Sequence, residues 1–339
     1  MYQPIRSNAG RREIQISSLA AKKGLNFSEL PQLLDASYAQ KNTNYLILPN
    51  GGLGSRKGMT RLFTQTGTAA ITAIEKYNST YWLIGYGKYL DAYNVTTGVF
   101  TNIKTFTTAG TFSIQRYGNF AFITNGTEGI GRVTYSAGWT YTTVAGAPTC
   151  GVLKAIGARL FAGNLSTDST AVAYSNIDSG ADPPFASWTT GTLANDPGLV
   201  SFRNAGTVNA IETLAQYIII FSEYGKWAFY INTIDQGGTL RKIDIFQISR
   251  LDLGGARCAK STTRGLFYAN DAGMWRLTSI CQPNIPFSDQ ENSPTAELLG
   301  TNYFDDVSLT QADIMYHAKY DTIFLTCAKG SSANNHVIT

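Results

Sequence analysis

The feature that most constrains the fold is a pair of short β-rich runs that recurs six times after residue 80. Each pair is joined by a connection of one to three residues, and such tight connections predict β-hairpins. In the first pair, Tyr81–Tyr86 and Tyr89–Val95 flank Gly87-Lys88. The other pairs are Phe112–Tyr117 with Asn119–Thr124, Val152–Ile156 with Arg159–Gly163, Val208–Leu214 with Tyr217–Ser222, Ala256–Thr262 with Gly265–Asn270, and Asp313–Ala318 with Thr322–Ala328.

Further strand candidates follow most of these hairpins, for example Arg132–Tyr135 with Trp139–Thr143, and Trp227–Ile231. A hairpin with one or two outer strands, repeated about every 40–50 residues, is typical of β-propeller blades. The sequence therefore predicts an all-β fold: a six-bladed β-propeller-like domain over residues 61–339, preceded by an N-terminal loop and helix segment over residues 1–60. A β-sandwich pair is the competing architecture, since no WD or kelch signature recurs.

Strands that are apolar on both faces support the propeller, because stacked blades bury both faces of a strand. Such runs include Phe120–Ile123, Tyr217–Phe221 and Ile323–Leu325. The stretch from Ser175 to Trp188 lacks strand character and predicts a long loop between strands.

The N-terminal segment carries the clearest helical pattern. Between Leu30 and Asn44, apolar residues recur near one face, and Pro31 suits a first helical turn. A weaker helix candidate is Pro294 to Leu299. Because this segment precedes the repeats, we expect it to provide contacts for assembly.

The sixth hairpin is followed by only eleven residues, which end at Thr339. An unfinished blade would expose a sheet edge with free N–H and C=O groups. An N-terminal strand such as Thr60–Phe63 or Glu13–Ser17 could complete the blade. Alternatively, the natural chain continues, and the strand-like ending Val337-Ile338-Thr339 favours this longer chain.

The composition indicates buried or interface-rich surfaces. Only 15% of the residues are charged, against about 25% in a typical soluble domain, whereas aromatic residues reach 12%. Interface cores are likewise depleted in charge and enriched in aromatic residues. The net charge is +4 and no long Lys/Arg run occurs, so we expect no tight grip on nucleic acid. No apolar run approaches transmembrane length, and the four scattered cysteines predict buried thiols in a reducing compartment.

Motifs of catalysis and metal binding are not recognisable. The glycine-rich stretch Gly51–Gly58 differs from a P-loop because Lys57 precedes a glycine rather than following one. Neither His317 nor His336 has a second His or Cys at ligand spacing, and no Gly-x-Ser-x-Gly elbow appears. We therefore expect no enzymatic activity, no cofactor and no metal ion.

Several short pieces, in a fixed order, resemble the tail nozzle or tail tubular proteins of short-tailed, podovirus-like bacteriophages. The resemblance covers roughly residues 14 to 328. The pieces are Lys23-Gly24-Leu25-Asn26-Phe27, Leu30-Pro31, Tyr38-Ala39, Asn42, Asn44, Gly51-Gly52-Leu53, Arg56-Lys57-Gly58, Arg159-Leu160-Phe161-Ala162-Gly163, Tyr174-Ser175, Trp188, Phe221-Ser222-Glu223, Gly265-Leu266-Phe267-Tyr268 and Gly273-Met274-Trp275.

This resemblance implies a structural protein of the virion tail, made in the host bacterial cytoplasm. The subunit would form a homo-oligomeric ring, expected to be a hexamer, below the portal-adaptor (head-tail connector) protein. The ring would extend the channel for DNA ejection, let viral DNA pass without tight binding, and anchor tail fibre or spike proteins, with no membrane insertion. The residues that it places at assembly contacts are Leu25, Asn26, Tyr38, Arg56 and Lys57.

Two other function classes stay open. A carbohydrate-binding propeller would also be rich in aromatic residues and non-catalytic, and a glycan-processing propeller would place its acids at the mouth of the channel. The oligomeric state separates these classes, because a ring supports the nozzle and a monomer supports the others.

Overall fold

The computed structural model describes residues 69–180, 183–233, 240–249, 258–270, 273–277, 307–317 and 322–329, and short strands at 5–6, 12–13, 45–47, 53–55, 291–292 and 336–338. The chain divides into two compact units by its internal contacts. The larger unit comprises Leu62–Asn270 and Leu277–Glu291. The smaller comprises Met1–Arg61, Asp271–Arg276 and Asn292–Thr339. The predicted domain division at residue 60 stays a prediction.

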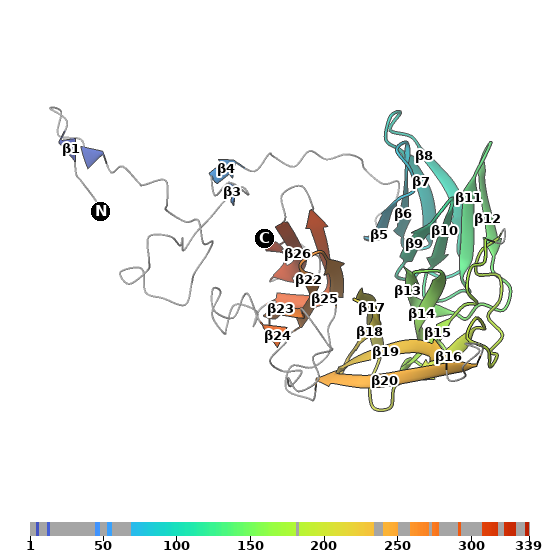
Figure 1. Ribbon diagram of the computed structural model, residues 1–339. Coiled ribbons are helices and arrows are strands. Elements are labelled where there is room, and N and C mark those ends of the chain that lie inside the picture. The colour runs from blue at the N-terminus through green and yellow to red at the C-terminus, as the bar shows by residue number, and fades with distance from the viewer. Residues whose placement is uncertain are drawn as a thin grey trace. The chain divides into compact units, whose positions relative to one another are not determined.

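Four consecutive four-stranded antiparallel sheets make up most of the larger unit (Figure 1), and in each the strands follow chain order from one edge to the other. The first contains β5 (Ile71–Lys76), β6 (Tyr81–Tyr86), β7 (Tyr89–Asn94) and β8 (Phe100–Thr105). The second contains β9 (Ser113–Tyr117), β10 (Phe120–Thr124), β11 (Gly131–Tyr135) and β12 (Trp139–Thr143). The third contains β13 (Cys150–Ile156), β14 (Arg159–Leu165), β15 (Ala171–Tyr174) and β16 (Gly198–Ser201). The fourth contains β17 (Val208–Leu214), β18 (Tyr217–Ser222), β19 (Lys226–Thr233) and β20 (Arg241–Ser249).

The hairpin of β21 (Cys258–Thr262) and β22 (Gly265–Asn270) comes next in the chain, followed by β23 (Gly273–Leu277) and β24 (Glu291–Asn292). The first strands of successive sheets lie next to one another: β5 contacts β9, β9 contacts β13, β13 contacts β17, and β17 contacts β21. Four-stranded sheets that meet along their first strands are the blades of a β-propeller. The prediction of an all-β, propeller-like fold is confirmed, whereas the number of six blades stays a prediction.

Hydroxyl side chains join the inner edges of neighbouring sheets. Ser113 Oγ accepts a hydrogen bond from Leu153 N at 3.1 Å. Between the first and second sheets, Thr72 Oγ1 accepts from Phe112 N at 3.0 Å, and between β17 and β21, Ser261 Oγ accepts from Thr213 N at 3.2 Å. These bonds satisfy backbone groups that the edge strands would otherwise leave without a partner.

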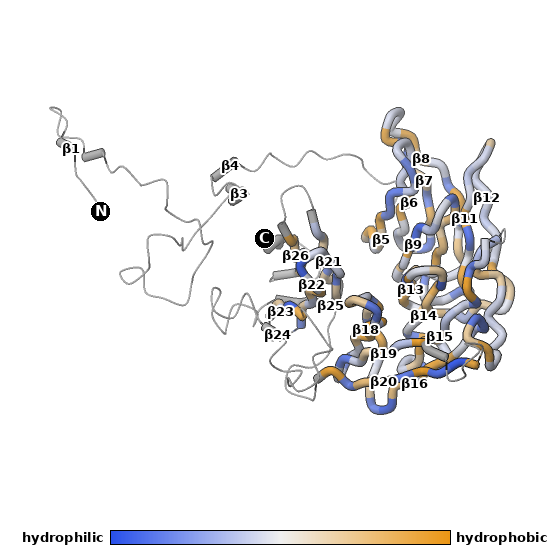
Figure 2. Tube along the Cα trace, viewed as in Figure 1, coloured by the Kyte–Doolittle hydropathy of each residue, from blue (hydrophilic) through white to orange (hydrophobic). Residues whose placement is uncertain are grey.

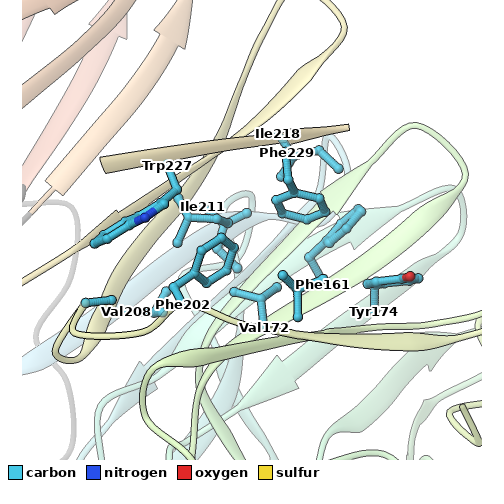
Figure 3. Close-up of a cluster of buried hydrophobic side chains, with 12 residues drawn as sticks. Phe161, Val172, Tyr174, Phe202, Val208, Ile211, Ile218, Trp227 and Phe229 are labelled. Carbon is cyan, nitrogen blue, oxygen red and sulfur yellow. The ribbon is translucent and has the colours of Figure 1, made fainter. Parts of the chain in front are cut away.

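The core lies between the sheets rather than within any single one. Figure 3 shows Phe161 and Tyr174 of the third sheet facing Phe229 of the fourth, and all three side chains are fully buried. Comparable clusters fill the spaces between the first and second sheets and between the second and third. Strands β10 and β18 are buried at almost every position, which confirms that runs apolar on both faces lie between blades.

The predicted hairpins are present, with one shift in position. Four of those in the larger unit are the first and second strands of their groups, such as β9–β10 and β13–β14. The hairpin predicted at Tyr81–Val95 is instead β6–β7, because β5 precedes it as the inner strand of the first sheet. The sequence of β5, Ile71–Lys76, ends in charged residues and gives a weaker strand signal than the sequences of β6 and β7. The long loop predicted after Ser175 joins β15 to β16.

The smaller unit contains a three-stranded antiparallel sheet of β25 (Val307–His317), β26 (Thr322–Lys329) and β27 (His336–Ile338). The sixth predicted hairpin is therefore confirmed, and the strand-like ending forms β27. The same unit contains the pairs β1 (Ile5–Arg6) with β2 (Arg12–Glu13) and β3 (Tyr45–Ile47) with β4 (Leu53–Ser55).

The predicted helices at Leu30 to Asn44 and Pro294 to Leu299 lie outside the described residues, as does Thr60–Phe63. In Glu13–Ser17, only Glu13 is described, as the end of β2. Completion of the last blade by an N-terminal strand stays a prediction. Over the part of the chain that the structure describes, no helix is long and apolar enough to span a membrane.

Candidate assembly surface

The outer edges of the third and fourth sheets carry large apolar side chains in solvent. On β16, which is the last strand of its sheet, Leu199 is 51% exposed. On β20, the last strand of the next sheet, Ile245 and Phe246 are 47% and 44% exposed. Figure 2 shows hydrophobic positions alternating with hydrophilic ones along β20. Exposed apolar side chains on an edge strand are typical of sites of protein association.

The loop that precedes β16 reaches the start of β20. Leu193 in this loop forms a β-bridge with Leu240, the residue before β20. Next to this bridge, Arg241 N donates to Thr192 O at 3.0 Å. Leu193 and Leu240 are 48% and 42% exposed, so exposed apolar side chains are present at this bridge as well as on the two edge strands. We call the surface of Leu193, Leu199, Leu240, Ile245 and Phe246 the outer-edge surface.

Two arginines hold the loop in place from the inside. The Arg241 guanidinium donates to Pro197 O at 2.8 Å and to Gly191 O at 2.6 Å. The Arg159 guanidinium donates to Asp196 O at 3.0 Å and also to Ala194 O. These bonds join the loop to β14 and β20, so the loop is fixed at both sheets.

The ring of Tyr174 lies near both of these guanidinium groups. The ring centroid is 5.1 Å from Arg159 Cζ and 5.7 Å from Arg241 Cζ, distances at which cation–π attraction operates. Burial lowers the pKa of Arg159 and raises the pKa of Tyr174. An arginine remains charged at any physiological pH and Tyr174 remains neutral, so two cations contact one neutral ring. We call Arg159, Arg241 and Tyr174 the clamp.

The energetics of the outer-edge surface favour apolar association over ion pairing. Lys242 and Asp244 form an ion pair on β20 at 2.9 Å, but Lys242 is exposed and Asp244 is only half-buried, and such surface pairs contribute about 0–1 kcal/mol. Burying the exposed half of one Leu, Ile or Phe side chain contributes about 1 kcal/mol, and three Leu, one Ile and one Phe are exposed here. A partner that covers this surface would therefore be held mainly by apolar contact.

Further ionisable side chains lie on the inner strands of the sheets. Lys154 on β13 pairs with the buried Glu212 on β17, and Ser261 Oγ donates to the same carboxylate at 2.8 Å. Burial is the main cause that raises the pKa of Glu75 on β5, whereas the charge of Lys260 lowers it. Lys154, Glu212 and Ser261 therefore bind one another across the neighbouring strands β13, β17 and β21. Within the described residues, no group of three His, Cys, Asp or Glu side chains could hold a metal ion.

The residues predicted as assembly contacts, Leu25, Asn26, Tyr38, Arg56 and Lys57, all lie outside the described residues. Their role stays a prediction. Sequence reasoning missed the outer-edge surface, although a signal was present. In Arg241–Ser249, charged and apolar residues alternate at first and then give way to Ile245-Phe246, as expected of a partly exposed strand.

Comparisons with known proteins identify no family. No family model matches the chain, and no curated protein matches it. Among solved structures, the extracellular domain of a one-component system from B. thetaiotaomicron is 13% identical, with a TM-score of 0.50 over 84% of this chain. The match spans 36% of that chain, about a third of its length. The β-propeller domain of Cps50 (Swd1) from Myceliophteria thermophila is 8% identical, with a TM-score of 0.47 over 82% of this chain and 88% of that chain. These are similarities of fold, and no activity or partner follows from them.

Proposed function

We propose that the protein is a structural component of a bacteriophage tail, the nozzle or tail-tube ring below the portal-adaptor protein. The observation that carries the proposal is the outer-edge surface, which gives each copy an apolar area on its rim. The low charge and the ordered resemblance to tail nozzle proteins support the same assignment. In this role the protein has no catalytic activity, lets viral DNA pass without tight binding, and anchors fibres or spikes.

A closed ring requires a heterologous interface, in which two different patches of neighbouring copies meet head to tail. We propose that the outer-edge surface is one of these patches and that residues 1–60 supply the other. Deletion of residues 1–30 should then impair assembly and leave the blades folded. A deletion variant that assembles normally would refute the contribution of the N-terminal segment.

The decisive measurement is the mass of the purified protein in solution, determined by light scattering and followed by electron microscopy. The proposal requires a ring of several copies. The variant Phe246→Asp should lower the mass towards that of the monomer, because a carboxylate at this position cannot be buried against an apolar partner. Tyr224→Asp, at a residue that is 59% exposed in a turn of the fourth sheet, is the matched control and should leave the ring intact.

A wild-type protein that is monomeric at all concentrations would refute the nozzle assignment. It would favour the alternative, a carbohydrate-binding or glycan-processing propeller. Nanomolar binding to DNA at physiological salt would also contradict the proposal, because tight phosphate contacts would stall passage through the ring.

A further inference from the structure

Three aromatic rings meet at one end of the first two sheets. They belong to Tyr81, the first residue of β6, Tyr135, the last of β11, and Trp139, the first of β12. The ring centroids are 4.8 Å apart for Tyr81 and Tyr135, 5.2 Å for Tyr81 and Trp139, and 4.8 Å for Tyr135 and Trp139. The rings therefore form a closed triangle, which we call the aromatic triangle.

The aromatic triangle is open to solvent on one side and supported on the other. Tyr135 is 37% exposed, and Tyr81 and Trp139 are half-buried. Beneath them, the buried ring of Tyr77 packs edge-on against Trp139 at 5.0 Å. Tyr77 Oη donates to Asn119 O at 2.5 Å and accepts from Tyr135 N at 3.1 Å.

This support holds the rings in position before any ligand arrives. Tyr77 ties the end of β5 to β11 and to the turn between β9 and β10, so the triangle spans two blades. A ligand that binds preorganised rings orders few side chains, which lowers the entropic cost of binding.

The polar groups at the aromatic triangle are neutral. Tyr81 Oη and Tyr135 Oη lie 3.1 Å apart, and this contact is the main cause that raises the pKa of Tyr135. The Tyr135 hydroxyl therefore stays protonated at neutral pH. Tyrosine hydroxyls can both donate and accept hydrogen bonds. The flanking segments Tyr77–Tyr81 and Thr134–Thr140 contain no charged residue, only aromatic, hydroxyl, amide and small side chains.

A neutral saccharide matches this chemistry. A pyranose ring offers a C–H face that packs on an aromatic ring, and hydroxyl groups that pair with neutral donors and acceptors. A charged ligand would find no opposite charge in the two flanking segments. We propose that the aromatic triangle of Tyr81, Tyr135 and Trp139 is a binding site for a neutral oligosaccharide. This site goes beyond the proposed structural role and does not depend on it.

The test is binding of the full chain to an array of neutral oligosaccharides, comprising cello-, malto-, manno- and chito-oligosaccharides of six units. Each oligosaccharide that binds is then titrated by calorimetry against wild type and variants. Tyr135→Ala should weaken binding at least about tenfold, because it removes the most exposed ring. Tyr135→Phe keeps the ring and removes the hydroxyl, so it should retain part of the affinity.

Tyr89→Ala is the matched control. Tyr89 lies in the first sheet, is 36% exposed, and also packs against a tyrosine, Tyr86, at 5.6 Å. The Tyr89→Ala variant should bind the oligosaccharide with the affinity of wild type. Unchanged thermal unfolding of Tyr135→Ala would show that this variant keeps its fold. The proposal is overturned if no neutral oligosaccharide binds, if only charged glycans bind, or if Tyr135→Ala binds as well as wild type. Because the solution mass is measured separately, a failure here leaves the ring assignment standing.

Discussion

Replacing Arg241 should release the loop that joins the third and fourth sheets at their outer edges. The guanidinium makes two hydrogen bonds, to Pro197 O and Gly191 O, and lies over the ring of Tyr174. Hydrogen bonds from a charged donor contribute about 1.5–3 kcal/mol each when buried. Arg241 is half-buried, so each bond should contribute near the lower end of this range. We therefore expect Arg241→Ala to lower the free energy of unfolding by about 2–4 kcal/mol.

Arg241→Lys should lose about half of this free energy, because an ammonium group lacks the planar fork that reaches two carbonyls at once. The free energy of unfolding of each variant is measured by urea titration. Amide hydrogen exchange of residues 191–197 reports the loop directly, and exchange there should accelerate in Arg241→Ala while β18 stays protected.

Lys242→Ala is the matched control, since Lys242 is the next residue, also cationic, and its side chain is 51% exposed. This variant should change the free energy of unfolding by less than about 0.5 kcal/mol. Unchanged loop exchange in Arg241→Ala would show that the clamp does not hold the loop. Equal destabilisation by Arg241→Ala and Lys242→Ala would show that the loss of a positive charge, rather than of the two hydrogen bonds to carbonyl groups, lowers the stability.

Three further predictions follow from single positions. Ala215 has a φ of 53°, in the left-handed region, so Ala215→Gly should raise the free energy of unfolding by about 1 kcal/mol in a urea titration; a loss of stability would contradict this. Burial raises the pKa of Glu75 above its unfolded value, so its ionisation favours the unfolded chain at neutral pH. Glu75→Gln should therefore be more stable than wild type at pH 7, with the difference vanishing below the unfolded pKa of 4.5; a difference that persists at pH 3 would refute the assignment to this carboxyl. Burial raises the pKa of the Cys150 thiol to about 12, so iodoacetamide at pH 8 should leave Cys150 unmodified until denaturant is added, as peptide mass spectrometry would report.

The sequence was informative about hairpins because their signals are local. Gly87, Gly118 and Gly157 each take a left-handed φ at the turn, a conformation that glycine adopts without steric cost, so the connecting residues mark the turns directly. The double-sided apolar runs of β10 and β18 likewise predicted strands buried between sheets. Buried cysteines were also predicted, and Cys150, Cys258 and Cys327 are buried, whereas Cys281 lies outside the described residues.

The position of each hairpin within its sheet could not be predicted from the local sequence. The inner strand β5 carries exposed residues and charges, so its sequence resembles that of an outer strand. It becomes an inner strand only because β9 lies beside it, a contact between residues about 40 positions apart. Contacts of this kind depend on how sheets stack, and no pattern within one segment encodes them.

The candidate sites likewise depend partly on composition, which the sequence shows, and partly on contacts between sheets, which only the structure shows. The recurring hairpins, read from the sequence alone, predicted the all-β fold, and the low charge and high aromatic content predicted neutral, aromatic-rich surfaces. Only the tertiary structure decided which apolar residues stay in solvent, because Ile245 and Phe246 look like core residues until β20 is placed at the edge of its sheet. It likewise decided that Tyr81 meets Trp139, since rings 58 positions apart come together only when two blades pack face to face.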